Sequence, residues 1–267
     1  GSPMYCRHFF KFNFGFARGD GSALMKKGEE VVHGGFFSQS SFATYALGTE
    51  RSVVKIPSDV PLELMGPLGC GVQTGAGAVI NSLKVQAGDS LAIFGAGAVG
   101  LSALLAAVVS GCATRICVDL NEQRLALAKE LGATHVLNPT EVDVVAEIQK
   151  ITGGGAKFSL ETSGSLKALR QAVDSIQILG ECGMIGAPAF GSEIGLDTWG
   201  LLLGRKIRGI CEGDSVPDIF IPKLVELYKQ GRFPFDKLVK LYPFEQINQA
   251  VGDSERGKTI KAVLQFA

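Results

Sequence analysis

The chain has 267 residues, and 26 lysine and arginine residues balance 26 aspartate and glutamate residues, so its formal net charge is zero. This balance, without a run of basic residues, argues against binding to nucleic acid or to an anionic membrane surface. A hydrophobic content of 46% with 19% charged residues excludes a mainly disordered chain, and the 35 glycines indicate many tight turns or backbone that approaches a ligand closely.

Residues 1–71 form the first distinct segment. They are rich in glycine, serine and phenylalanine and lack a regular alternation of strands and helices, so we expect short strands and loops there. Phe9, Phe10, Phe36 and Phe37 would either line an aromatic substrate pocket or pack into the core of a β-rich domain. The residues alone leave both interpretations open.

Residues 90–114 contain no charged side chain and are long enough to span a bilayer. However, an apolar run at 91–94 precedes three glycines in the first half of this stretch. This order predicts a strand, a tight turn and a buried helix that ends near Ser110, because the interior of an α/β sheet is also uncharged. We therefore expect no membrane span.

Strands and helices then alternate at short intervals. The further predicted strands are residues 115–118, 135–137, 157–161 and 182–185. Gly132 is expected to end the first intervening helix. Thr140 and Asp143 match a capping box before the next helix, and Ser165 is expected to cap the last one. This alternation predicts a parallel sheet covered by helices on both faces, over roughly residues 72–214.

Residues 215–267 contain two predicted helices and a terminal strand. The first helix runs from about 217 to 230, the second begins at Phe244, and the strand covers 259–266. Neither this segment nor residues 1–71 looks sufficient to fold alone. We therefore expect the two segments to form one second domain.

The six cysteines are scattered, include no Cys-x-x-Cys pair and do not resemble a disulfide framework. With no secretory signal visible at the N-terminus, we expect a reducing compartment and a cytoplasmic protein. Four cysteines are expected to be buried and unreactive, namely Cys112, Cys117, Cys182 and Cys211. The histidines have no cysteine or acidic partner at metal-ligand spacing and are expected on the surface, namely His8, His33 and His135.

Gly95, Gly97 and Gly100 form a GxGxxG pattern between a predicted strand and a predicted helix. In a dinucleotide-binding fold the first glycine permits the turn, the second lets a pyrophosphate approach the backbone at the helix N-terminus, and the third lets helix and strand pack closely. Asp119 ends the next strand at the expected spacing, where it would bind the ribose hydroxyls and repel a 2′-phosphate, which favours NAD over NADP. The alternative is a glycine-rich turn of another α/β protein, with Asp119 only capping a strand end.

The segment GPLGCGVQTGAG at residues 66–77 shortly precedes this turn. Together with GAGAVG, VDLNEQR, ELGATHVLNP and the closing GKTIKAVLQF, it resembles the zinc-dependent medium-chain alcohol dehydrogenases. Within that family, GPLGCGVQTGAGA, FFSQSSFATYAL and FIPKLVELYKQGRFPFDKLVKLYPFEQINQA are most similar to the aryl-alcohol (benzyl-alcohol) dehydrogenases. The resemblance covers residues 3–267.

The resemblance implies an α/β fold with a Rossmann doubly wound parallel sheet and a partial GroES-like, β-rich catalytic domain. Residues 72–214 would form the NAD-binding Rossmann domain, and residues 1–71 together with 215–267 would form the partial catalytic domain. Leu201–Gly209 matches a region through which subunits of the family pair, which implies a homodimer or homotetramer.

The resemblance also implies roles for single residues. Cys70 matches the third ligand of the catalytic zinc, Thr74 matches a residue that packs near the nicotinamide, and Val99 matches the side chain behind that ring. Arg124 matches a basic residue that reaches the adenosine ribose. Lys261 matches a pyrophosphate-binding arginine, and lysine keeps the charge there without the bidentate geometry. The carboxamide side of the coenzyme would meet the backbone of Ile185, Gly186 and Ala187.

This sequence departs from the family pattern at its metal sites. The family places its first catalytic-zinc cysteine, its zinc-binding histidine and three structural-zinc cysteines upstream of the residues present here, and Cys6 resembles the fourth structural ligand. Because a catalytic zinc needs three protein ligands, we expect zinc in the parent protein but not in this chain, which resembles a member that begins partway through its catalytic domain. On the residues alone, Cys70 would be a small buried side chain, Thr74 a packing residue and Arg124 a solvated helix charge.

We therefore expect the parent protein to oxidise a primary, aromatic alcohol to its aldehyde with NAD, through zinc-assisted hydride transfer. This chain is expected to bind NAD with weak or absent turnover. Two alternatives stay open. One is a zinc-free enone or quinone reductase of the same superfamily, against which Cys70 and Cys6 argue, and the other is a non-catalytic NAD-binding module.

Overall fold

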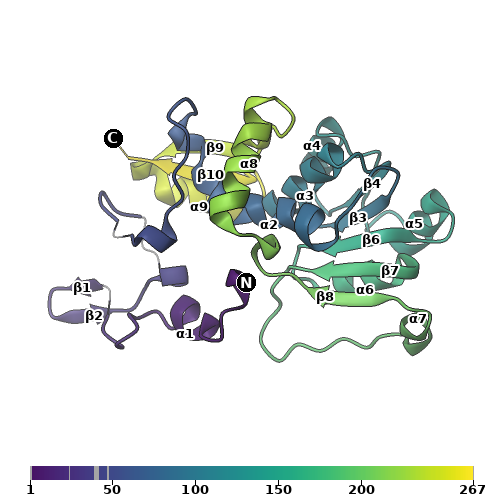
Figure 1. Cartoon of the computed structure of the whole chain (residues 1–267), viewed down its shortest axis with the longest axis horizontal. Coiled ribbons are helices and arrows are strands. Elements are labelled where there is room, and N and C mark those ends of the chain that lie inside the picture. The colour runs from purple at the N-terminus through teal and green to yellow at the C-terminus, as the bar shows by residue number, and fades with distance from the viewer. Residues whose placement is uncertain (1, 24, 39–41, 47, 267) are drawn as a thin grey trace.

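The computed structural model describes residues 2–23, 25–38, 42–46 and 48–266 and is dominated by one parallel sheet (Figure 1). Six strands lie in the order β5-β4-β3-β6-β7-β8. Their bounds are β3 Ser90–Phe94, β4 Thr114–Val118, β5 His135–Leu137, β6 Ala156–Glu161, β7 Ile176–Met184 and β8 Lys206–Gly209. All neighbouring pairs are parallel, and the strand order reverses between β3 and β6. The predicted Rossmann doubly wound sheet is confirmed.

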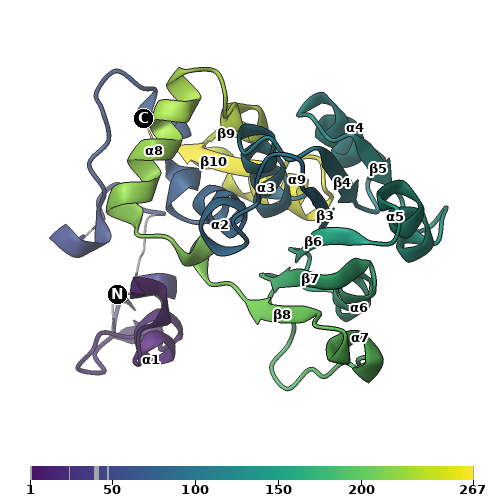
Figure 2. The ribbon, with the colours of Figure 1, turned by 45° about the vertical axis from the view of Figure 1, so that its right-hand side comes forward.

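Helices cover both faces of the sheet, as Figure 2 shows. They are α3 Ala98–Val109, α4 Glu122–Glu130, α5 Val144–Thr152, α6 Leu166–Asp174 and the short α7 Thr198–Leu202. Side chains alternate along β3, so Leu91 and Ile93 belong to the core under α3, whereas Ala92 and Phe94 belong to the core under α5 and α6. None of the described helices is long and apolar enough to cross a membrane.

Of the two predicted helix N-caps, one is confirmed and one is wrong. The Ser165 hydroxyl accepts the backbone N–H of Ala168 at the start of α6. The predicted cap at Thr140 is wrong, because the Asp143 carboxylate caps α5 by accepting the N–H of Ala146 at 3.1 Å. Thr140 instead donates its hydroxyl to the Asn138 side chain within the preceding turn.

Helix α2 (Gly71–Gly77) connects the N-terminal segment to the sheet and packs directly on α3. A Cβ atom on Gly75 would lie only 1.9 Å from the carbonyl oxygen of Val99. Only glycine permits this approach, so the sequence GVQTGAG determines how closely the two helices pack.

The C-terminal segment forms α8 Pro217–Lys229, β9 Val239–Pro243, α9 Ile247–Glu255 and β10 Lys261–Gln265. Strands β9 and β10 pair in parallel as a small separate sheet, and α8 packs on α2 (Figure 2). Inside this segment the Tyr242 hydroxyl lies 3.0 Å from Asp253 Oδ2 and 2.8 Å from Thr259 Oγ1. Both predicted helices and the predicted terminal strand are present.

The N-terminal segment contains short elements, as expected. They are α1 Phe9–Phe14, the antiparallel pair β1 Met25–Lys27 and β2 Glu30–Val32, and several 3₁₀ turns. Within the described residues, these strands and the β9–β10 pair close no barrel. Phe37 contacts Phe9 and Phe36 at ring distances of 6.0 and 4.7 Å, and Phe10 is 62% exposed. This aromatic cluster therefore lies at the surface and outside the buried core.

Candidate functional site

In the turn between β3 and α3, Gly95 and Gly100 are tightly packed, whereas Gly97 faces open space. Gly95 has a φ of +103°, and a Cβ on it would meet Thr162 Oγ1 at 2.7 Å. A Cβ on Gly100 would lie 1.8 Å from the carbonyl oxygen of Gly95. At Gly97 no atom of the described residues lies within 4 Å of the Cβ position. Since no side chain caps α3 there, its first N–H groups are available to an anion.

Asp119 joins this turn to the end of β4. Its Oδ2 accepts the backbone N–H of Ala96 at 2.6 Å, and its Oδ1 accepts the backbone N–H of Asn121 at 2.9 Å. Each carboxylate oxygen has a second lone pair, so Asp119 can still accept hydrogen bonds from a vicinal diol. The carboxylate is half-buried at the carboxyl edge of the sheet.

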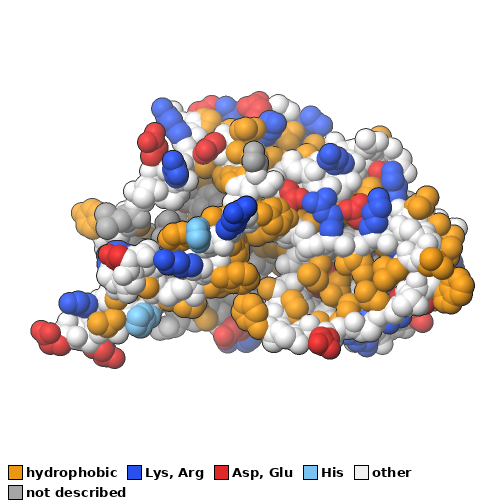
Figure 3. Space-filling model, turned by 60° about the horizontal axis from the view of Figure 1, so that its bottom comes forward, with side chains coloured by type: hydrophobic (Ala, Val, Ile, Leu, Met, Phe, Trp, Pro, Cys, Tyr) orange, Lys and Arg blue, Asp and Glu red, His pale blue; other side chains and the backbone are white. Residues whose placement is uncertain are grey.

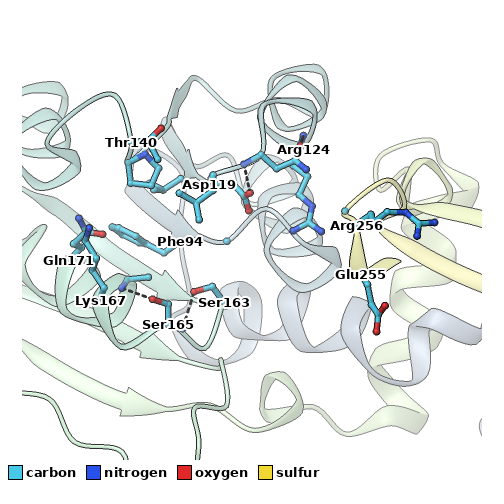
Figure 4. A pocket seen from close by; sticks show the side chains of 17 residues that line it. Phe94, Asp119, Arg124, Thr140, Ser163, Ser165, Lys167, Gln171, Glu255 and Arg256 are labelled. Carbon is cyan, nitrogen blue, oxygen red and sulfur yellow. Dashed lines mark hydrogen bonds between the residues drawn. The ribbon is translucent and has the colours of Figure 1, made fainter. Parts of the chain in front are cut away.

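A pocket of about 540 Å³ opens beside Asp119 (Figure 4). It is lined by Phe94, Gly95, Asp119 and Arg124 and by the Ser163–Gln171 and Glu255–Gly257 regions. Arg124 extends toward the loop that carries Arg256. Its Nε is buried, and no acceptor among the described residues reaches it. A buried donor without a partner is costly, and NAD fits this arrangement because its adenosine ribose supplies acceptor oxygens.

The end of β6 lies beside this turn, and the end of β7 lies one strand further along the same edge. The backbone N–H groups of Ile185 and Gly186 donate to the carbonyl oxygen of Glu161 at 2.9 and 3.1 Å. The Glu161 carboxylate is itself satisfied by the N–H groups of Ser163 and Gly164, at 2.6 and 3.0 Å. Ile185, Gly186 and Ala187 therefore lie at the edge that also carries Gly95 and Asp119.

A second group of side chains meets at the start of α2. The Thr74 Oγ1 lies 2.9 Å from the carbonyl oxygen of Cys70 and 3.0 Å from Glu212 Oε2. The Cys70 Sγ lies 3.8 Å from Glu212 Oε1. Cys70 is exposed and is not the small buried side chain that the residue alone suggested. Partial desolvation nevertheless raises the pKa of its thiol, the Glu212 carboxylate raises it further, and Lys261 opposes both. Val99 lies alongside, because a Cβ on Gly71 would be 3.7 Å from its Cγ2.

Glu212 is the residue that the sequence analysis missed. It follows β8, and with Gly213 and Asp214 it forms three consecutive left-handed residues with φ of 47°, 66° and 49°. The Asp214 carboxylate holds this turn, accepting from Arg208 at 2.6 Å and from Tyr5 at 2.5 Å. The available signal was an acid shortly after a parallel strand, since Glu212 follows the end of β8 by three residues and Asp119 follows β4 directly.

Neither candidate zinc ligand, Cys70 or Cys6, lies within a set of metal-binding side chains in the part of the chain that the structure describes. Cys6 is exposed, and its Sγ accepts only the backbone N–H of His8 at 3.4 Å among the contacts described. Cys70 has one carboxylate neighbour, and no group of three or more His, Cys, Asp or Glu side chains at metal-binding distance occurs in the described part of the chain. Since a catalytic zinc needs three protein ligands, these residues alone do not complete a zinc site.

The remaining cysteines and histidines agree with expectation except for Cys211, which was expected to be buried. Cys112, Cys117 and Cys182 are buried, and Cys211 is half-buried. Burial raises the pKa of Cys112 and Cys182 to about 11 and that of Cys117 to about 12. All three histidines are exposed. None of these residues belongs to the two groups described above.

Known proteins resemble this chain over its whole length. Residues 98–230 match the family model of a zinc-binding dehydrogenase. A geraniol dehydrogenase from Castellaniella defragrans is 46% identical, and the match covers 100% of this chain and 72% of that relative. Among solved structures, an alcohol dehydrogenase zinc-binding domain protein from Burkholderia ambifaria is 56% identical with a TM-score of 0.95, covering 100% of this chain and 72% of that one.

A crystal structure of benzyl alcohol dehydrogenase from Acinetobacter calcoaceticus is 52% identical with a TM-score of 0.95, covering 100% of this chain and 73% of that one. The chain therefore belongs to the zinc-dependent medium-chain family of NAD-dependent alcohol dehydrogenases, as its motifs predicted.

Proposed function

We propose that this chain binds NAD along the carboxyl edge of its sheet and supplies that site for oxidising a primary, aromatic alcohol to its aldehyde. The observation that carries the proposal is the Asp119 carboxylate, hydrogen-bonded to Ala96 beside the open face of Gly97. The pyrophosphate would lie at the N-terminus of α3, and the adenosine ribose between Asp119 and Arg124.

The nicotinamide half would extend over the carboxyl ends of β6 and β7. Val99 and Thr74 would contact the ring, the backbone of Ile185–Ala187 would meet the carboxamide, and Lys261 would face the pyrophosphate. Residues 72–214 would form the NAD-binding domain. Calorimetric titration tests this assignment, because saturable binding of NADH with much weaker binding of NADPH is expected. Equal affinities would contradict the role of Asp119.

The alcohol is proposed to be aromatic because the benzyl alcohol dehydrogenase is 52% identical to this chain. The geraniol dehydrogenase, at 46% identity, is the competing relative. The two alcohols can be compared by supplying each with NAD and following the absorbance of NADH. We expect faster turnover of benzyl alcohol than of geraniol. A preference for geraniol would refute the aromatic assignment.

No reaction step is assigned through zinc, because the described residues do not complete its site. Cys70 would contribute one ligand where others are supplied. For the chain as it stands we propose NAD binding with weak turnover, so adding zinc should leave benzyl alcohol oxidation low. Strong zinc-dependent oxidation, together with one equivalent of zinc by elemental analysis, would overturn this part of the proposal.

The chain is proposed to form a homo-oligomer through the edge strand β8, which pairs only with β7 within the described sheet. Exposed apolar side chains lie in this region, namely Ile178, Leu179, Trp199, Leu202 and Leu203, and Figure 3 shows hydrophobic side chains gathered on this face. Leu202→Glu should lower the mass measured by light scattering. Leu62→Glu is the matched control, because Leu62 and Leu202 are both 72% exposed. A wild-type monomer would refute the proposal.

A further inference from the structure

Acidic side chains lie at the carboxyl edge of the sheet in both halves of the fold. Asp119 follows β4 in the first half, and both of its oxygens accept backbone N–H groups. Glu212 lies beyond β8 in the second half, and its carboxylate faces Thr74 and Cys70. In a doubly wound fold the two halves of a dinucleotide lie over the two halves of the sheet. Glu212 is therefore on the side of the nicotinamide.

The Glu212 carboxylate is half-buried and has no cationic partner. No lysine, arginine or histidine of the described residues lies within ion-pair distance of it. Its hydrogen-bond partners are the neutral Thr74 hydroxyl and Cys70 thiol. Two other acids in this half have partners, since Glu161 accepts backbone N–H groups of Ser163 and Gly164 and Asp214 is paired with Arg208. Glu212 thus keeps an uncompensated charge at the nicotinamide end.

The fold holds Glu212 in place at a conformational cost. Its φ of 47° is left-handed, which is uncommon for a residue other than glycine and concentrates at functional sites. Two contacts hold the neighbouring residues: Asn81 Nδ2 donates to the carbonyl oxygen of Gly213 at 3.2 Å, and the Ser82 hydroxyl donates to the Asp214 carboxylate at 2.8 Å. These contacts hold the carboxylate in place without neutralising it.

We propose that Glu212 makes the site favour oxidised over reduced coenzyme. The nicotinamide ring is positively charged in NAD⁺ and neutral in NADH. A nearby carboxylate in a half-buried site therefore stabilises bound NAD⁺ and not bound NADH. This inference rests on the proposed binding of NAD. It assigns Glu212 a role in determining coenzyme specificity.

The test is the ratio of the Kd for NAD⁺ to the Kd for NADH, measured by titration calorimetry at pH 8. Glu212→Gln should raise this ratio about fivefold to tenfold, because it weakens the binding of NAD⁺ and leaves the binding of NADH unchanged. Glu226→Gln, which removes a carboxylate from the exposed face of α8, should leave the ratio unchanged. Glu212→Asp, which keeps the charge, should keep most of the preference.

Glu212→Asn serves as a second neutral variant, because asparagine tolerates left-handed backbone better than glutamine. If a folded neutral variant left the ratio unchanged, or weakened the binding of both coenzymes equally, the role of Glu212 would be refuted. The proposal that the chain binds NAD would still stand. Wild-type protein that binds neither coenzyme would instead refute the proposed function itself.

Discussion

Replacing Gly97 or Gly100 with alanine separates two constraints on the turn between β3 and α3. Both substitutions add one methyl group only three residues apart. At Gly100 that methyl would lie 1.8 Å from the carbonyl oxygen of Gly95, so backbone must move. At Gly97 it would point into open space, with φ at −82°, which alanine adopts without strain.

The expected magnitudes differ accordingly. Overpacking against backbone costs about 1–3 kcal/mol or more, so Gly100→Ala should lower the free energy of unfolding by about 3 kcal/mol. Gly97→Ala loses a favourable helix N-cap residue but restricts the unfolded chain, and these effects of roughly 0.5–1 kcal/mol largely cancel. The added methyl would nevertheless occupy the pyrophosphate position, so NADH affinity should fall at least about tenfold, or ~1.4 kcal/mol.

Urea unfolding followed by circular dichroism measures the first effect, and NADH calorimetry measures the second. Gly97→Ala should melt like the wild type and bind NADH poorly. If it bound NADH as tightly as the wild type, the pyrophosphate would not lie at the N-terminus of α3. If Gly100→Ala were as stable as Gly97→Ala, the close packing of turn and helix would be refuted.

Three further predictions follow from single contacts. Asp119→Asn should shift the NADH-to-NADPH affinity ratio about tenfold toward NADPH by calorimetry, whereas Asp143→Asn at the cap of α5 should not. Burial raises the pKa of Cys182 from 9.0 to about 11, so the unfolded thiol ionises first and the free energy of unfolding should fall by about 2–3 kcal/mol between pH 9 and 11. In urea titrations at several pH values, the free energy of unfolding of Cys182→Ala should fall less between pH 9 and 11 than that of Cys6→Ala. The same pH dependence in both variants would contradict this. Tyr242→Phe should cost about 1–3 kcal/mol in thermal unfolding, because it leaves the buried Asp253 and Thr259 without their shared partner.

Most of the sheet could be predicted because its signals are local. The strand His135–Leu137 has the predicted bounds, and Ser165 caps the helix it was expected to cap. The glycine turn was recognisable because strand, glycines, helix and Asp119 occur in a fixed order along the chain. Each of these features depends on residues within about one element of one another.

The features that could not be predicted depend on distant partners or on competing local hydrogen bonds. Glu212 meets Thr74 across 138 residues of sequence, and no periodicity encodes that contact. Asp143 caps α5 in place of Thr140, because the Thr140 hydroxyl donates to the Asn138 side chain. For Arg124, the sequence left two alternatives, a ribose-binding residue and a solvated charge on a helix. The structure adds that its Nε is buried and has no hydrogen-bond partner among the described residues.

The sparse packing of the N-terminal segment has a consequence for how the chain would be degraded. The first buried hydrophobic residue along the described chain is Met65, whereas every residue of α2 and eight of the twelve residues of α3 are buried. Segments with little apolar burial open at low free energy and are cut first by proteases. Brief trypsin treatment should therefore trim residues before about Met65 and leave a resistant fragment that retains the sheet, its glycine turn and α2.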